Sequence, residues 1–313
     1  MQKFYTHSML EIIKTLKNRL QILDAKKIIE FEVLNPDSCT SCYAGNSVTL
    51  ENVPYIYRGY SAWNDLAQIL HCKMLTPRII SEHTIVLRFE KLNADDSFHN
   101  SIADKEEKYG DTSIFSEIHK MQEPAFITHF FKALENVNIN RRIRILNLGV
   151  NSGDEFEAIK EYATNFKNLE LVGIDYCTSA INVAKKKFKE DTNISFYTHD
   201  INDLASLKLG VFDLIISIGT LQSSNLDFNA LLMSIVQNQL KREGAMILGF
   251  PNCRWLDGEM IYGAKVKNYA FSEMGLLYKD VIFSKKYLQQ KKFRVTITGK
   301  DYIFLTATSI RKN

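Results

Sequence analysis

The sequence predicts an α/β fold in which a mostly parallel sheet ends in an antiparallel hairpin, preceded by a smaller α+β unit. Three observations predict it: an apolar strand that breaks into a glycine turn at residue 149, a regular alternation of strands and helices after it, and two final strands joined by a short link. With 313 residues, of which 45% are hydrophobic, the chain can bury one full domain and a second, smaller one.

The first strand of the predicted sheet covers residues 144–148 and is apolar on both faces, which is typical of a parallel strand. Gly149 and Gly153 follow it and allow the backbone to turn tightly and to approach a ligand closely. Residues 154–162 have helical character. The turn therefore leads to a helix N-terminus, where ligands of α/β proteins commonly bind.

The second strand, residues 169–175, ends in the carboxylate of Asp175. Its distance from Gly149 along the chain suits an acid that accepts hydrogen bonds from both ribose hydroxyls of a nucleoside. We therefore expect a nucleoside ligand at the first two strands.

The later elements continue the alternation. We expect helices over residues 178–190, 226–240 and 284–292, and strands over residues 193–200, 212–218, 245–250, 293–298 and 302–308. Gly244, preceded by two cations, is expected to close the helix over 226–240. Only residues 299–301 join the last two strands, so this pair must be an antiparallel hairpin.

The glycine spacing decides between nucleotide classes. A dinucleotide fingerprint needs glycines at positions 149, 151 and 154, but Asn151 and Asp154 stand at two of them, and the Asp154 carboxylate would face a pyrophosphate. The run from Asn147 through Gly149 and Asn151 to Gly153 instead resembles motif I of class I S-adenosylmethionine (SAM) methyltransferases. Asn147 replaces the usual acid and Asn151 the middle glycine. An asparagine can still donate or accept a hydrogen bond there, since SAM carries no phosphate.

The resemblance extends over residues 121–313 and implies a seven-stranded Rossmann-like methyltransferase sheet with an antiparallel C-terminal hairpin, and SAM as the cofactor. It implies that Asp175 binds the ribose, that Asp200 accepts from the adenine amino group, and that Ile201 packs on the adenine ring. By the same analogy the segment before the sheet, with Ser113 and Lys120 as further candidates, closes over the methionine end of SAM. The cofactor residues it implies are Asn147, Gly149, Asn151, Gly153, Asp175, Tyr176, Asp200, Ile201, Ser217 and Tyr109.

The acceptor site of an open α/β sheet lies beyond the C-terminal ends of its strands, here in the segments 219–225 and 250–269. Methyl transfer is an in-line displacement that depends on alignment, and a base is needed only if the acceptor starts protonated. We expect Glu259, or else Asp257, to act as base and Arg254 or Lys265 to hold an anionic group, with Tyr262 beside them. The expected substrate contacts are Lys265, Tyr269 and Trp63.

Residues 1–105 are predicted to form a separate α+β cap, with helices over 10–23 and 61–72 and strands over 74–80 and 84–92, and residues 106–313 the SAM-binding domain. The boundary lies in the polar stretch between residues 93 and 110. We expect the cap to face the segment 251–269 across the mouth of the cofactor site.

Five scattered cysteines, no apolar run long enough for a bilayer and no signal-peptide core predict a cytoplasmic protein without membrane contact. Cys39 and Cys42 are expected to be free thiols. His71 and Cys72 could complete a zinc site only if both reached one metal, but neighbours on a helix point about 100° apart. We therefore expect no metal.

Charge and motifs narrow the function. The net charge is only +3, but residues 241–313 hold fourteen basic and six acidic groups, against fourteen and sixteen in residues 1–120. The run from Ser217 to Thr220 differs from the Asn-Pro-Pro-aromatic tetrad of amino-methylating DNA methyltransferases, so DNA is not expected. The sequence predicts methyl transfer to an O or N atom of a small or medium polar acceptor. Two alternatives remain: a tRNA methyltransferase and a non-catalytic SAM-binding module. The oligomeric state is left open.

Overall fold

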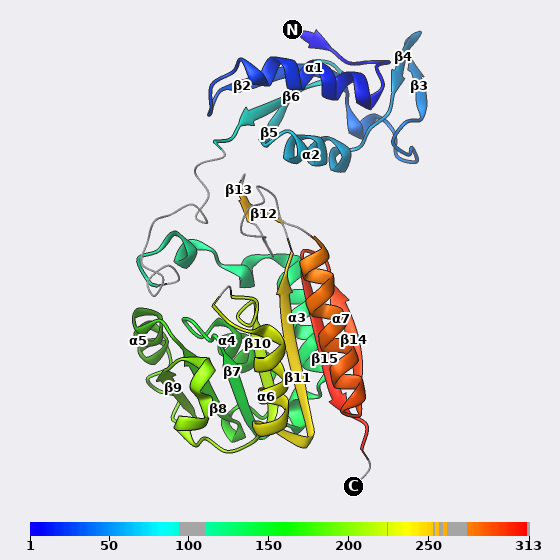
Figure 1. The fold of residues 1–313 in the computed structure, drawn as a ribbon. Coiled ribbons are helices and arrows are strands. Elements are labelled where there is room, and N and C mark those ends of the chain that lie inside the picture. Colours follow the sequence, from blue (N-terminus) through cyan, green and yellow to red (C-terminus); the bar gives the residue numbers. More distant parts are fainter. Residues whose placement is uncertain (94–109, 224, 253, 257–258, 262–273, 312–313) are drawn as a thin grey trace. The chain divides into compact units, whose positions relative to one another are not determined.

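The computed structural model describes residues 1–93, 110–223, 225–252, 254–256, 259–261 and 274–311 (Figure 1). The chain divides into two compact units. One comprises Met1–Asn100 together with Trp255–Ile261, and the other Ser101–Arg254 together with Tyr262–Asn313. The boundary predicted between residues 105 and 106 lies outside the described residues. The grouping of residues 255–261 with the N-terminal unit was not predicted.

The N-terminal unit is the α+β structure that the sequence predicts. Its elements are β1 (Gln2–Lys3), α1 (Met9–Gln21), β2 (Ile28–Leu34), β3 (Ser47–Leu50), β4 (Val53–Ile56), α2 (Tyr60–Ile69), β5 (Cys72–Ile79) and β6 (Thr84–Lys91), with a 3₁₀ turn η1 (Pro36–Ser38). The main sheet has the order β1-β2-β6-β5, and β3 and β4 form a separate hairpin. Strand β2, which the sequence analysis missed, lies in the middle of the main sheet. Its core is aromatic: Phe31 contacts Phe89 and Trp63 at centroid distances of 5.0 and 6.0 Å.

The second unit contains the predicted seven-stranded sheet. Its strands are β7 (Arg144–Leu148), β8 (Glu170–Asp175), β9 (Ile194–Thr198), β10 (Phe212–Ile218), β11 (Leu240–Pro251), β14 (Phe293–Gly299) and β15 (Tyr302–Ser309), in the order β14-β15-β11-β10-β7-β8-β9. Strand β15 is antiparallel to both β11 and β14, while the pairs from β11 to β9 are parallel. The predicted fold class and its final antiparallel hairpin are confirmed.

Helices cover both faces of this sheet (Figure 1). The helices α3 (Pro124–Asn136), α4 (Asp154–Tyr162) and α5 (Thr178–Lys187) pack on one face, and α6 (Phe228–Asn238), α7 (Met274–Gln290) and the 3₁₀ segment η9 (Ile201–Leu207) on the other. Successive strand residues face opposite sides: Ile145 belongs to the first core and Leu146 to the second. Further 3₁₀ turns are η5 (Ile114–Glu117), η6 (Lys120–Gln122), η7 (Ile139–Arg141) and η8 (Phe166–Asn168).

Some predicted boundaries were wrong. Helix α6 ends at Asn238, and the run up to Gly244 starts strand β11 and does not cap the helix. The register explains this: Phe212 pairs with Leu240 but Leu214 pairs with Ala245, so the extra residues form an irregularity at the start of β11. Helix α7 begins at Met274, earlier than predicted, and short strands β12 (Arg254–Leu256) and β13 (Glu259–Ile261) pair where no strand was expected.

The cysteine prediction also needs correction. Cys39 and Cys42 are joined in a disulfide and are not two free thiols. Cys72 and Cys177 are buried thiols, and Cys253 lies outside the described residues. Within the described part of the chain, no helix is both long and apolar enough to cross a membrane.

Candidate functional site

The glycine turn after β7 has the conformation that the sequence predicts, but packing within the chain accounts for both glycines. Gly149 and Gly153 have φ angles of +75° and +87°, which side chains disfavour. A Cβ atom on Gly149 would lie 1.8 Å from Thr220 Oγ1, and one on Gly153 would lie 2.6 Å from a ring carbon of Phe188. The close approach of a ligand is therefore not needed to explain them, and the case for a ligand rests on the polar groups around the turn.

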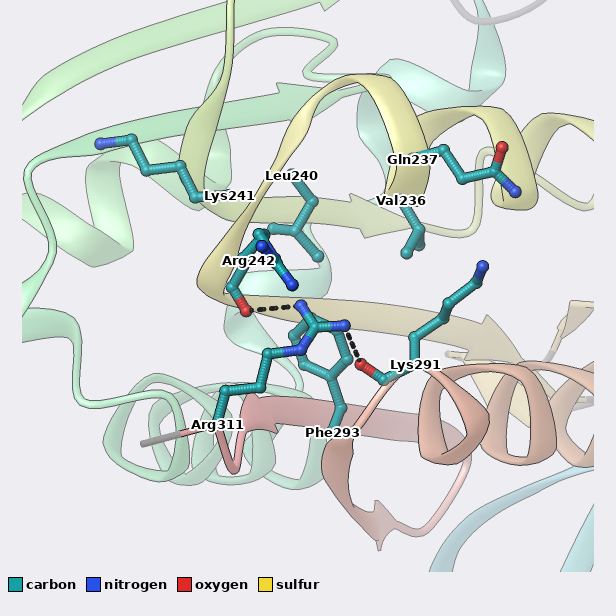
Figure 2. A pocket seen from close by; sticks show the side chains of 8 residues that line it. All are labelled: Val236, Gln237, Leu240, Lys241, Arg242, Lys291, Phe293 and Arg311. Atoms are coloured by element: carbon teal, nitrogen blue, oxygen red, sulfur yellow. Dashed lines mark hydrogen bonds between the residues drawn. The ribbon is translucent and has the colours of Figure 1, made fainter. Parts of the chain in front are cut away.

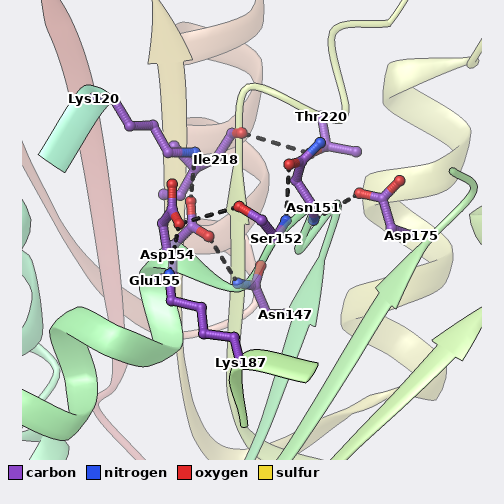
Figure 3. Close-up of polar contacts among 10 residues, drawn as sticks. All are labelled: Lys120, Asn147, Asn151, Ser152, Asp154, Glu155, Asp175, Lys187, Ile218 and Thr220. Atoms are coloured by element: carbon purple, nitrogen blue, oxygen red, sulfur yellow. Dashed lines mark hydrogen bonds and ion pairs between the residues drawn. The ribbon is translucent and has the colours of Figure 1, made fainter. Parts of the chain in front are cut away.

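Asp175, at the end of β8, faces this turn (Figure 3). Its Oδ2 accepts from the backbone N–H of Asn151 at 2.9 Å, and its Oδ1 accepts from that of Cys177 at 2.9 Å. Burial raises the pKa of the Asp175 carboxyl, although the backbone N–H groups of Cys177, Asn151 and Tyr176 oppose this shift. Each carboxylate oxygen can accept a second hydrogen bond, so the group can still bind two ribose hydroxyls.

The second acid lies at the end of the neighbouring strand. Strands β8 and β9 are parallel, so Asp200, which follows β9, lies at the same sheet edge as Asp175. The Asp200 side chain is exposed, and its Oδ1 accepts from the backbone N–H of Asn202 at 2.9 Å. Tyr176 is 50% exposed, whereas Ile201 is only 7% exposed and packs in the core. Asp175, Tyr176 and Asp200 thus form a polar and aromatic surface suited to a nucleoside.

A buried charged cluster lies on the other side of the glycine turn. Glu155, only 1% exposed, accepts from Asn147 Nδ2 at 3.3 Å and forms an ion pair with Lys120 at 2.7 Å (Figure 3). Burial lowers the pKa of Lys120, but the charge and hydrogen bond of Glu155 together with Tyr302 and Asp154 exceed this effect, so the pKa is raised. Asn147 Oδ1 is buried and has no hydrogen-bond partner in the described structure.

Glu155 was not among the predicted site residues, although the residue pattern of helix α4 indicates that it is buried. On helix α4, Glu155 precedes Ala158 and Ile159 by three and four residues, and both of these are buried. Residues at this spacing share one helix face, so an acid at position 155 had to point into the protein.

The start of helix α4 is electrostatically unsuited to a phosphate. Its first turn carries Asp154, Glu155 and Glu157, where the helix dipole would otherwise favour an anionic ligand. Burial alone would raise the pKa of Asp154, but Lys187, at 3.1 Å, and Lys120 lower it, so this carboxylate stays ionised. The arrangement disfavours a dinucleotide and fits a nucleoside that carries a cation instead.

Comparison with known proteins now places the chain. A family model described as a methyltransferase domain matches residues 139–297, which is half of the chain. The chain belongs to the methyltransferase domain family. This methyltransferase depends on SAM, whose sulfonium supplies an electrophilic methyl group when bound. No curated protein matches the chain.

Solved structures similar to this methyltransferase include the N-methyltransferase NodS from Bradyrhizobium japonicum in complex with S-adenosyl-L-homocysteine (SAH). The two are 14% identical, the match covers 70% of this chain and 100% of that one, and the TM-score is 0.45. The plantazolicin methyltransferase BpumL in complex with a monoazolic desmethylPZN analogue and SAH is 14% identical, with 61% of this chain and 88% of that chain covered and a TM-score of 0.45.

The residues of the C-terminal unit fit SAM. Asp175 and Asp200 offer acceptors for the ribose and the adenine amino group, and no phosphate has to be placed at the acidic start of α4. Across the turn, Asn147 Oδ1 and Ser217 Oγ are buried polar atoms without a partner in the described structure, as expected where a polar ligand completes a site.

The prediction that Trp63 contacts the substrate is wrong on physical grounds. Trp63 is 1% exposed, and its indole N–H donates to the backbone oxygen of Arg58 at 3.1 Å, so it belongs to the core of the N-terminal unit. The residues Tyr109, Asp257, Tyr262, Lys265 and Tyr269 lie outside the described part of the chain, and for Arg254 and Glu259 only the backbone strand is described. Their roles remain predictions, as does the expected position of the cap.

A separate cavity of about 190 Å³ gathers basic side chains at the opposite edge of the sheet (Figure 2). It is lined by Val236, Gln237, Leu240, Lys241, Arg242, Lys291, Phe293 and Arg311. The guanidinium of Arg311 donates to the backbone oxygens of Arg242 and Lys291 at 3.2 and 2.8 Å. Leu240 is the first residue of β11, so this basic cavity adjoins the N-terminal ends of the parallel strands.

Proposed function

We propose that this methyltransferase transfers the SAM methyl group to an O or N atom of a small or medium polar acceptor at the C-terminal edge of the sheet. The observation that carries the proposal is an unsatisfied buried group in the segment after β10. Gln222 Oε1 is buried and has no protein partner within the described residues. An unsatisfied buried polar group costs about 1–3 kcal/mol, and a polar acceptor that binds there would offset this cost.

The reaction is an in-line displacement in which the bond from sulfur to the methyl carbon breaks while the bond from O or N to carbon forms. SAH leaves as the neutral thioether. Glu259 is proposed to take the proton of a hydroxyl or ammonium acceptor, and Arg254 to hold an anionic group of the acceptor. Tyr262, Lys265 and Tyr269 are proposed to line the same site. This segment follows β11, which runs parallel to β10, and β10 runs parallel to β7, so β11 ends at the edge that carries the glycine turn.

The experiment offers SAM with a labelled methyl group to the small-molecule fraction of a cell extract and, separately, to total tRNA. We expect label in small molecules only. Glu259→Gln should lower turnover by about 10²-fold or more, the usual contribution of a general base, with SAH affinity within a few-fold of wild type. Glu243→Gln, on the strand end beside the basic cavity, is the matched control and should leave turnover unchanged. Label that enters only tRNA would contradict the proposal.

One observation favours tRNA as a second candidate acceptor. The basic cavity presents Lys241, Arg242, Lys291 and Arg311, its lining includes no acidic residue, and none of these cations forms an ion pair in the described structure. Phosphates bound there would release counterions, so Arg242→Gln with Lys291→Gln should reduce the salt slope of tRNA binding by about 2. Unchanged binding would remove this candidate.

The basic cavity lies far from the cofactor residues, which is why the small acceptor is proposed first. It adjoins the start of β10, and the cofactor residues lie beyond the ends of the parallel strands. Seven residues of β10 span roughly 20 Å at about 3.3 Å per residue. A tRNA that docks at this cavity would therefore have to reach across the sheet to present its methylated atom.

The third possibility, a SAM-binding module without activity, rests on Asn147 and Asn151 in motif I. SAH binding without label transfer to either fraction would support it. The buried carboxylate of Glu155 beside Asn147 weakens this possibility, because the acid that position 147 lacks is present nearby.

A further inference from the structure

Position 147 lacks the acid of motif I, yet a carboxylate lies against it from the neighbouring helix. We propose that Glu155 takes the place of this acid as a positioning residue. It holds the Lys120 ammonium at the amino-acid end of the cofactor site, where Lys120 receives the α-carboxylate of SAM. The proposal rests on the SAM dependence of this methyltransferase and concerns how this chain in particular builds that end of the site.

The sheet order places the cluster at the end of the site opposite the nucleoside. The strands run β9-β8-β7-β10, and Asp200 follows β9 while Asp175 is the last residue of β8. A ligand with adenine near Asp200 and ribose on Asp175 must extend its remaining part over the Gly149 turn towards β10.

The contacts of Lys120 show that it lies in this direction, towards β10. Its ammonium lies 5.8 Å from the centre of the Phe126 ring, and Phe126 contacts the ring of Tyr302 at 5.1 Å. The Tyr302 hydroxyl lies beside Gly219, immediately after β10, where an added Cβ would be only 2.5 Å from it. Lys120 therefore lies on the β10 side of the turn, where the amino-acid part of SAM would lie.

Lys120 and Glu155 differ in how deeply they are buried. The side chain of Lys120 is 17% exposed and that of Glu155 is 1% exposed, so of the two charged side chains only that of Lys120 retains surface open to a ligand. An ammonium has three N–H donors, and one suffices for Glu155. The others can bind an α-carboxylate, an anion that the acidic start of α4 would otherwise repel.

Asn147 completes the arrangement because it is neutral. Its amide donates to Glu155 Oε2 at 3.3 Å and so orients the carboxylate towards Lys120. An aspartate at position 147 would set two buried carboxylates side by side and force one of them to bind a proton. The carboxylate at this place therefore comes from the helix and not from the strand, and the Asn147 amide is its partner.

The experiment compares the binding of two ligands to wild type and to variants at positions 120, 147 and 155, including one in which the acid and the amide of positions 155 and 147 are exchanged. SAH carries the amino-acid end, whereas 5′-methylthioadenosine has the same nucleoside and sulfur without it. Glu155→Gln and Lys120→Gln should each weaken SAH binding about tenfold or more, the equivalent of one charge-assisted hydrogen bond, and change methylthioadenosine binding less than about twofold. Asn147→Asp should also weaken SAH binding, and the double variant Asn147→Asp with Glu155→Gln should recover most of it.

Glu135→Gln is the matched control. It breaks the 2.7 Å ion pair between Glu135 and Lys132, both of which are exposed. This change should affect neither SAH binding nor methylthioadenosine binding. Thermal melting establishes which variants fold. If Glu155→Gln does not fold, Lys120→Gln and the double variant carry the test.

The possible failures are distinguishable. If wild type binds SAH more tightly than methylthioadenosine but the Lys120 and Glu155 variants change both affinities equally, or neither, the inference is overturned and SAM dependence stands. If wild type binds neither ligand, the cofactor assignment itself fails, and this inference fails with it.

Discussion

Replacement of Asp175 with alanine tests the nucleoside site. In the cofactor complex the carboxylate would accept one hydrogen bond from each ribose hydroxyl, and each charge-assisted bond contributes about 1–2 kcal/mol after solvent exchange. Asp175→Ala should therefore cost about 2–4 kcal/mol of SAH binding, which corresponds to a loss of affinity of about 30- to 1,000-fold. The assay is titration calorimetry with SAH.

The structure also predicts what the substitution does to the free protein. The carboxylate accepts from the N–H groups of Asn151 and Cys177, both 2.9 Å away, so these two donors lose their partner. We expect about 1–2 kcal/mol of lost stability and a folded protein, because the group lies at a strand end where water can replace it. Unchanged SAH affinity in a folded Asp175→Ala variant would refute the ribose role.

Three further predictions follow from the same site. Burial raises the pKa of Asp175, so the folded state is stabilised when this carboxyl is protonated. This contribution to the free energy of unfolding is fully present below the usual Asp pKa of about 3.9 and is lost as pH rises through the raised pKa. Ribose hydroxyls favour the ionised form, so SAH affinity should fall as pH decreases through that raised pKa, and Asp175→Asn should abolish this dependence in calorimetry. Asp200→Asn should weaken SAH binding less than Asp175→Ala does, since an amide oxygen still accepts from adenine; an equal loss would contradict its assigned role. Gly153→Ala should lower the free energy of unfolding in urea by about 1–3 kcal/mol, because φ is +87° and the new Cβ would meet Phe188, and an unchanged midpoint would contradict this.

The sheet of the C-terminal unit was predictable because its central strands, such as β7 and β10, are buried on both faces and its strands alternate with amphipathic helices. The bounds of α4 and β10 agree with the predicted 154–162 and 212–218. Strand β2 was missed because it carries two acids, Glu30 and Glu32. Glu32 is 5% exposed and pairs with Lys3 at 3.2 Å, and this tertiary contact is not visible in a local pattern.

The candidate site was predictable where a side chain follows a strand. Asp175 and Asp200 lie at the sheet edge that was predicted from the ends of their strands, because parallel strands bring their C-terminal ends to one edge. Trp63 was misjudged although it shares a helix face with Leu66 and Ala67, both buried. An aromatic residue at that spacing is explained by core packing before any contact with substrate is considered.

The glycine motif predicted the right turn for an incomplete reason. Thr220 and Phe188 occupy the space that a side chain at Gly149 or Gly153 would need, and both come from segments distant in the sequence. The pairing of Glu155 with Lys120 likewise joins a helix to a turn before the sheet. Such long-range packing arises only when the chain folds.

The central claim is that the glycine turn and Asp175 bind a nucleoside, while the acidic start of α4 excludes a ligand with phosphates there. Calorimetry of the wild-type protein with SAH and NAD tests it most directly. We expect SAH to bind with a dissociation constant on the order of micromolar and NAD to show no binding, because the first turn of α4 carries Asp154 and Glu157 beside the buried Glu155, and this negative charge would repel a pyrophosphate. Tighter binding of NAD than of SAH would contradict the account.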